Sequence, residues 1–171
     1  MNRNVTRAPA QEAACWLLTL LWCAGVLAGA FWVWYHGELW TAGFPHCAAA
    51  GLNPAGALTA AVGPMLVSAA MYVLLGRHCI WFLGPVRGFL MGVAAAGIGL
   101  CWGTGGPMMA VLLLFSGLFS APLQLLLWHR FLRGGVDTLW RETGALIGMA
   151  VLIAAADYWI VSPFLVEVLN F

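Results

Sequence analysis

The chain alternates between long apolar stretches and short polar ones, and this pattern predicts an integral membrane protein. A run of about 20 apolar residues in a helix reaches ~30 Å, which is the thickness of the hydrocarbon core of a bilayer. We expect an all-α, polytopic fold of about five transmembrane helices in a single domain, residues 1–171. The expected spans cover residues 15–35, 57–75, 88–102, 108–128 and 144–165.

Two segments of the chain depart from this regular pattern. Residues 36–56 are rich in glycine and alanine with two prolines and an asparagine, and we expect them to form the first outer loop. Residues 79–86 are apolar but too short to cross a bilayer, and a Gly84-Pro85 pair divides them. They are predicted to form a short re-entrant or interfacial segment.

The first apolar stretch has a second interpretation as a cleaved signal peptide. Residues 28–30 (AGA) resemble a small-residue cleavage site. The stretch is long for a signal peptide, however, and continues through Trp32 and Trp34, which are typical of an aromatic belt at a membrane interface. We therefore predict a retained first span.

The charges predict an orientation in the membrane. With the N-terminus in the cytoplasm, five spans place all seven cations, every one an arginine, on the inner side. They are Arg3, Arg7, Arg77, Arg87, Arg130, Arg133 and Arg141. The outer segments then carry only Glu38 and Glu167. This asymmetry follows the positive-inside rule and predicts a plasma-membrane protein with its C-terminus outside.

Composition supports the membrane interpretation and excludes other classes. Of the 171 residues, 63% are hydrophobic and 8% charged, against about 25% charged in soluble domains. The net charge of +1 argues against a nucleic-acid partner. The five cysteines form no CxxC pair and fit no disulfide framework, and we expect no cofactor.

Small residues at four-residue spacing mark a helix surface for close packing. Gly84, Gly88 and Gly92 form such a row. In a bilayer, small residues let helix backbones approach closely, which drives association. The row predicts either packing within the chain or the interface of a homo-oligomer.

Asp157, thirteen residues into the last expected span, is the strongest candidate for a functional polar residue. An aspartate at this depth costs about 2.5–3.5 kcal/mol and needs water or a partner. Ser116 and Ser120 of the fourth span lie at similar depth and can hydrogen-bond to it. Asp157 is interpreted as a proton or cation site, as a polar clamp between helices, or as a neutral or partly hydrated carboxyl near the outer interface.

Two further polar residues stand beside helix breaks. Gln124 follows Pro122 near the inner end of the fourth span, and Arg87 follows Gly84-Pro85 at the inner face. A polar group beside a break is typical of working regions in transporters. For Arg87 the alternative is a side chain that reaches out to the membrane surface.

Metal and catalytic sites find little support in the residue pattern. His36, Glu38, His46 and Cys47 of the outer loop are metal-binding residue types, but their spacing matches no ligand pattern. The chain has no phosphate-binding loop, no GxSxG, no HExxH and no carboxylate pair at useful spacing. We therefore expect no metal site and no enzyme.

Two segments resemble the family of stage II sporulation protein M, a small multi-span bacterial membrane protein. Residues 82–92 (FLGPVRGFLMG) look like the family's basic, glycine-rich opening of a helix. Residues 118–126 (LFSAPLQLL) are similar to its later helix with a proline and a glutamine. The resemblance implies a scaffold that recruits membrane-anchored cell-wall hydrolases during sporulation and engulfment.

These observations lead to two hypotheses of different classes. The first is a non-enzymatic membrane scaffold for peptidoglycan-remodelling partners, as the resemblance implies. The second is a small permease or channel subunit that uses Asp157 as an intramembrane polar site. In either case membrane lipid is a partner, and a homo-oligomer is left open.

Overall fold

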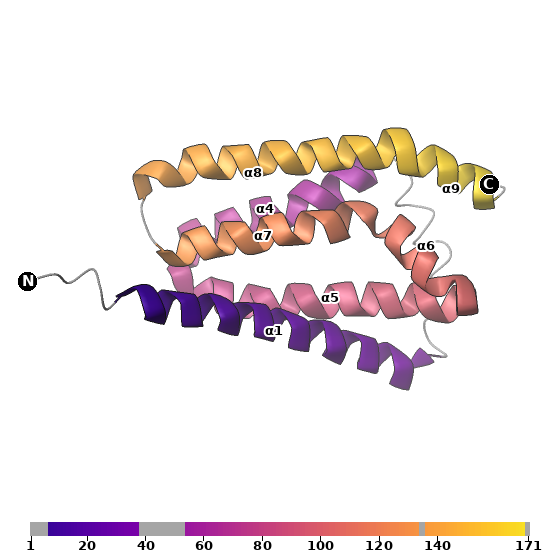
Figure 1. The fold of residues 1–171 in the computed structure, drawn as a ribbon, viewed down its shortest axis with the longest axis horizontal. Helices are drawn as coiled ribbons and strands as arrows, with labels where there is room; N and C mark the ends of the chain where they lie inside the picture. Colours follow the sequence, from indigo (N-terminus) through magenta and orange to yellow (C-terminus); the bar gives the residue numbers. More distant parts are fainter. Residues whose placement is uncertain (1–6, 38–53, 134–135, 170–171) are drawn as a thin grey trace, which may run out of the picture.

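The computed structural model describes residues 7–37, 54–133 and 136–169, and in these ranges it contains helices and no strand. The prediction of an all-helical fold is confirmed. The long helices run along a common axis (Figure 1). They are α1 (Arg7–Tyr35), α4 (Pro54–Leu75), α5 (Cys79–Trp102), α7 (Phe115–Arg133) and α8 (Val136–Ala156). Two short helices, α6 (Gly106–Leu113) and α9 (Ser162–Leu169), lie before α7 and after α8.

Three segments of the described chain are long and apolar enough to cross a membrane, namely Glu12–Tyr35, Ala55–Leu113 and Arg141–Leu165. Their outward faces carry large apolar side chains, such as Trp34 at 80% and Leu74 at 78% exposure. Exposed apolar surface on this scale suits lipid rather than water. The protein is therefore a multi-pass membrane protein.

The second of these segments cannot be one straight helix. It has 59 residues, which would extend ~90 Å as a single helix. A short 3-10 turn, Gly76–His78, reverses the chain between α4 and α5. Gly76 has a φ of +71°, in the left-handed region that favours glycine, and so permits the reversal.

The predicted re-entrant segment at residues 79–86 is wrong. These residues form the first turns of α5, which starts at Cys79 instead of residue 88 and continues through Pro85. A membrane helix tolerates an internal proline when neighbouring groups satisfy the freed carbonyl. As a consequence Arg87 lies within a helix, ~12 Å along its axis from Cys79, and does not follow a helix break as predicted.

The predicted fourth span, 108–128, is divided between two helices. α6 ends at Leu113 and α7 begins at Phe115. Gly106 lies so close to the backbone of Gly99 that a Cβ atom there would come within 2.6 Å of the Gly99 Cα. This contact holds α6 against the end of α5, so the chain must bend before it can return as α7 (Figure 1).

The predicted fifth span, 144–165, is also interrupted. Residues Asp157–Val161 form a π-helical turn between α8 and α9, and the Ser162 N–H donates to the Asp157 carbonyl. Pro163 follows Ser162 in the first turn of α9, and it has no N–H to donate to a backbone carbonyl of the preceding turn. The wider π-turn accommodates the proline, and Asp157 is its first residue. Turns of this kind inside helices are frequent at functional sites.

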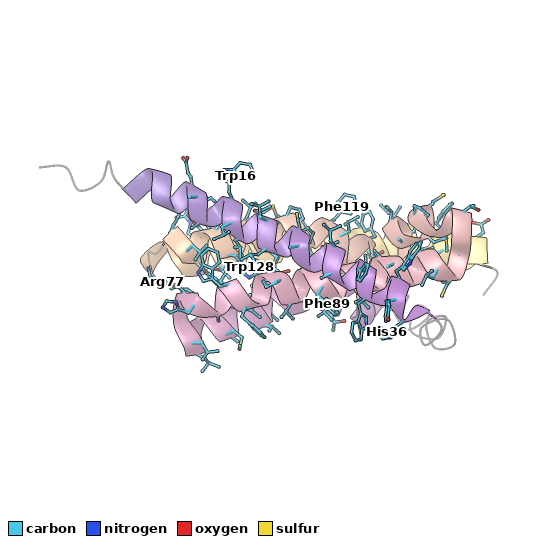
Figure 2. All side chains as sticks on the ribbon, turned by 90° about the horizontal axis from the view of Figure 1, so that it is seen from below. Trp16, His36, Arg77, Phe89, Phe119 and Trp128 are labelled. Carbon is cyan, nitrogen blue, oxygen red and sulfur yellow. The ribbon has the colours of Figure 1, made fainter. Side chains whose placement is uncertain are left out.

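The helices alternate in direction so that most described arginines gather at one end of the bundle. α1, α5 and α8 run one way, and α4 and α7 run the other (Figure 1). One end therefore holds the turn with Arg77, the last turn of α7 with Arg130 and Arg133, and the start of α8 with Arg141. Figure 2 shows Arg77 at that end. Arg87 is the exception, because it lies inside α5.

The main core lies in the half of the bundle nearest the arginine-rich end. Trp128 of α7 and Ile80 of α5 are fully buried there, and Leu18 of α1 is almost so. Tyr72 and Phe131 stack with ring centroids 4.3 Å apart. This core fixes α4, α5 and α7 around the space in which the polar residues of the interior meet.

Candidate functional site

The predicted packing glycines lie in the interface between α1 and α5. A Cβ atom at Gly88 would overlap the carbonyl oxygen of Trp22, and one at Gly92 would overlap that of Val26. The contact is mutual, since Cβ atoms at Gly25 and Gly29 would overlap α5 carbonyls. These glycines bring two helices of the same chain together, so Gly88 and Gly92 are already covered by α1.

Gly84 has a different neighbourhood, one turn before Gly88 on α5. A Cβ atom there would meet the side chain of Leu18 at 2.9 Å and that of Trp128 at 3.8 Å. Gly84 therefore makes room for the side chain of Leu18, whereas its contact with Trp128 is at an ordinary van der Waals distance.

A cavity of about 330 Å³ lies between α4, α5 and α7. Its wall consists of Thr59, Gly63, Pro64, Val67 and Ser68 of α4, Leu83, Val86, Arg87 and Leu90 of α5, and Gln124 and Trp128 of α7. Two predicted site residues, Arg87 and Gln124, therefore share one cavity, although they stand 37 positions apart in the sequence.

Gln124 joins α7 to α4 through a small hydrogen-bond network. Its Nε2 donates to the Pro64 carbonyl at 3.2 Å and to Ser68 Oγ at 3.2 Å. Ser68 Oγ in turn donates to the Pro64 carbonyl at 2.6 Å. Both side chains are almost fully buried, and hydrogen bonds of this kind hold membrane helices together. The network fixes the Gln124 amide on the cavity wall.

Arg87 brings a positive charge to the same wall without a compensating partner. Its Nε atom is buried and has no hydrogen-bond partner, and no ion pair joins it to any side chain that the structure describes. The guanidinium extends towards α7, where its Nη2 would lie 3.7 Å from a Cβ atom at Gly117. A charged group at this depth faces water, a partner or a ligand in working membrane proteins.

Trp128 is part of the cavity wall but adds no open donor to it. Its indole Nε1 is buried and has no hydrogen-bond partner in the described chain. Trp128 is 0% exposed, so this donor is closed off by the surrounding packing. Arg87 is therefore the charged group that a ligand in the cavity could contact.

Asp157 and Ser116 form a separate polar pair. Ser116 Oγ donates to Asp157 Oδ2, and both residues are buried between α7 and the π-turn. The predicted contact between these two residues is present. Ser120 does not join it, because its hydroxyl donates to the Gly117 carbonyl instead. Neither Asp157 nor Ser116 lies on the wall of the Arg87 cavity.

A second cavity, of about 370 Å³, lies between α1 and α7 near the arginine-rich end. His129 and Cys15 are on its wall, and His129 Nε2 is buried without a hydrogen-bond partner in the described residues. The cavity carries no full charge on its wall, in contrast to the cavity that holds Arg87. It is therefore the weaker candidate for a binding site.

The expected outer-loop residues lie mostly outside the described part of the chain. Glu38, His46 and Cys47 fall within residues 38–53, which the structure does not describe. His36 is described, and its ring lies 4.3 Å from that of Trp32. Among the described residues, no group of three or more histidine, cysteine or acidic side chains could hold a metal ion.

Sequence reasoning missed Ser68, Thr59 and Trp128 as cavity residues. A serine four positions after Pro64 was the available signal, because a hydroxyl at that spacing can bond to the proline carbonyl. Nothing in the sequence indicated Trp128, since its indole reaches the cavity only through the packing of α7 on α5.

A comparison of the chain with protein-family models, curated proteins and solved structures finds no match.

Proposed function

We propose that the chain is a non-enzymatic protein of a bacterial plasma membrane with five spans, formed by α1, α4, α5, α6 with α7, and α8 with α9. The N-terminus lies in the cytoplasm and the C-terminus outside. The gathering of Arg77, Arg130, Arg133 and Arg141 at one end of the bundle supports this orientation. Arginine-rich segments stay on the cytoplasmic side during insertion.

Within that membrane we propose a role as a small permease or channel subunit that binds its solute in the α4–α5–α7 cavity. The observation that carries this proposal is Arg87, whose Nε is buried and unpartnered on the cavity wall. Its charge costs free energy in the unliganded protein, and a bound anion would offset that cost. Five spans are few for a transporter, so the subunit would work as an oligomer or with partners.

Asp157 takes a supporting role in this proposal. Its carboxyl group accepts the Ser116 hydroxyl and lies off the cavity wall. It joins the π-turn to α7 and so positions the last helices against the bundle. Arg87 and Gln124, rather than Asp157, are the residues that would contact the solute.

Ion flux into vesicles tests the permease. Purified protein is reconstituted into vesicles loaded with potassium salts, and valinomycin makes potassium efflux depend on the permeability of the anion. We expect faster efflux than from empty vesicles for at least one of chloride, nitrate, acetate and phosphate.

Two variants make the flux experiment specific. Arg87→Gln should return efflux to the empty-vesicle rate, because it removes the charge in the cavity. Arg130→Gln should keep the wild-type rate, because Arg130 is about half exposed and pairs with Glu142 at the end of the bundle. Folded protein that gives background flux with all four anions would overturn the permease proposal.

The second candidate is a scaffold that resembles stage II sporulation protein M and organises membrane-anchored wall hydrolases. The segments that carry the resemblance, residues 82–92 and 118–126, lie on α5 and α7. Because α1 covers Gly88 and Gly92, a partner would have to dock on outward residues of α5 such as Phe82 and Leu90.

A pull-down from native membranes in mild detergent, read by mass spectrometry, separates the two candidates. Recovery of wall hydrolases by both the wild type and Arg87→Gln would favour the scaffold. Recovery of the protein alone or with itself, together with Arg87-dependent flux, would favour the permease.

A further inference from the structure

We propose that the α4–α5–α7 cavity binds the singly charged oxyanion head of a lipid with one apolar tail, such as a long-chain carboxylate. The lipid would enter sideways from the bilayer between α4 and α5. This inference rests on the proposed binding site and not on conduction through it.

The one charged group on the cavity wall is a donor. Arg87 lines the cavity, and no ion pair or hydrogen bond joins its guanidinium group to the residues that the structure describes. The Pro64 carbonyl, in contrast, already accepts from both Gln124 and Ser68. A ligand that matches these groups must accept hydrogen bonds, as a carboxylate or phosphate does with the fork of a guanidinium group.

The charge of the cavity sets the charge of the ligand. Of the acidic side chains that the structure describes, Glu142 pairs with Arg130 and Asp157 with Ser116, and none lies on the cavity wall. Arg87 therefore adds one positive charge that the described chain does not compensate. A ligand with a single negative charge would neutralise it, and opposite charges at contact distance attract each other more strongly near a protein interior than in bulk water.

The rim of the cavity faces the bilayer. Val67 on α4 is 55% exposed and Leu90 on α5 is 53% exposed, and both line the cavity. Apolar side chains at such positions contact lipid tails when the bundle is in a membrane. Arg87 lies ~12 Å along α5 from its start at Cys79, so a ligand approaching between α4 and α5 arrives through the hydrocarbon region.

The volume of the cavity fits a head group rather than a whole lipid. About 330 Å³ is at the lower end of the range for pockets that bury drug-sized ligands. The carboxylate and the first part of the chain would fill it, against apolar residues such as Leu83 and Val86. The rest of the tail would stay among the bilayer lipids. It would therefore remain shielded from water without further contact with the protein.

Native mass spectrometry of the purified full-length protein in a non-ionic detergent tests the inference, with oleate as the probe. We expect one oleate per chain in the wild type. Arg87→Gln should weaken binding about tenfold or more, since hydrogen bonds to a charged group contribute about 1.5–3 kcal/mol. Arg87→Lys should retain part of the affinity, and Arg130→Gln should bind like the wild type.

Two probes separate the possible sources of the anion. Methyl oleate has the same tail without the charge, and it should bind no better to the wild type than to Arg87→Gln. Inorganic phosphate, tested by thermal unfolding, has the charge without the tail and should not stabilise the wild type at the oleate concentrations that do. Equal binding of oleate and methyl oleate would overturn the proposed charge recognition, and stabilisation by phosphate at those concentrations would overturn the lipid as the source.

A second variant is available in case Arg87→Gln does not fold. If Arg87→Gln is not recovered as folded protein, Arg87→Met keeps a long side chain, removes the charge and should weaken oleate binding about tenfold or more. Unchanged binding in that variant would count against the inference. Oleate binding without flux would overturn only the permease, whereas flux without oleate binding would overturn only the lipid ligand.

Discussion

At the scale of single residues, the bundle keeps an arginine in a place where its charge is costly. Arg87 is held in α5 among apolar neighbours, and its buried Nε has no partner among the described residues. Charges of this kind persist in proteins when they serve a function, because replacing them with neutral groups of similar size is often stabilising. The cost of the Arg87 charge can be measured in the protein without any ligand.

Arg87→Gln should therefore raise the stability of the ligand-free protein while it removes function. We expect a gain of about 1 kcal/mol or more in the free energy of unfolding, and a midpoint higher by roughly 2–4 °C in thermal unfolding. Arg130→Gln is the control, since an exposed pair such as Arg130–Glu142 contributes about 0–1 kcal/mol. A clear loss of stability in Arg87→Gln would mean that Arg87 has a structural partner.

The hydrogen bond between Ser116 and Asp157 predicts an energetic coupling. Ser116→Ala and Asp157→Ala should be non-additive in thermal unfolding, with a coupling of about 0.5–3 kcal/mol. Ser120→Ala is the matched control on the same helix, because Ser120 donates to the Gly117 carbonyl. It should combine with Asp157→Ala almost additively, and equal coupling for both serines would contradict the assigned bond.

At the scale of helices, backbone proximity decides which faces are used. α1 and α5 run in the same direction and approach each other through Gly25, Gly29, Gly88 and Gly92, each of which has no space for a Cβ atom. Figure 2 shows α1 lying across the bundle next to Phe89. Close contact of this kind stabilises helix pairs in membranes, where burial of leucine gives no advantage over lipid.

Glycine substitutions on α5 should differ sharply by position. Gly88→Ala forces a methyl group onto the Trp22 carbonyl, and we expect a loss of about 1–3 kcal/mol from overpacking. Gly99→Ala lies on the same helix with no atom within 4 Å of its Cβ atom, and it should be neutral or slightly stabilising. Thermal unfolding of the two purified variants compares them, and equal effects would contradict the α1–α5 interface.

At the scale of the whole molecule, the ends of the bundle differ in charge. Arg77, Arg130, Arg133 and Arg141 lie at one end, and the π-turn and α9 lie towards the other. The start of α1 and the end of α9 are at opposite ends of the long axis (Figure 1). In the orientation proposed above, with the arginine-rich end inside, the start of α1 and the end of α9 would face different sides of the membrane.

Fusions to the C-terminus test that orientation. Alkaline phosphatase attached after Phe171 should be active, because it folds only outside the cytoplasm, and a green fluorescent protein at the same place should stay dark. The reverse pattern would contradict either the orientation or the odd number of spans. A fusion of green fluorescent protein to the N-terminus is the positive control and should fluoresce.

The sequence by itself determined the class of protein and the kinds of residue available to a site. Long apolar stretches with few charges dictate membrane helices, since a backbone in lipid must satisfy its own hydrogen bonds. The sequence also marked Arg87, Gln124, Ser116 and Asp157, because polar groups are rare among so many apolar ones. The sequence showed the chemistry of these four residues, but it did not show which groups they contact.

Tertiary structure alone decided where helices break and which polar residues meet. α5 continues through Pro85, and the fourth span bends at Leu114, because contacts with neighbouring helices outweigh the local preferences of proline and glycine. The same packing brings Arg87, Gln124 and Trp128 to one cavity wall and leaves Asp157 off that wall. Periodicity shows what one helix exposes, but the cavity forms only where three helices that are distant in sequence enclose the same space.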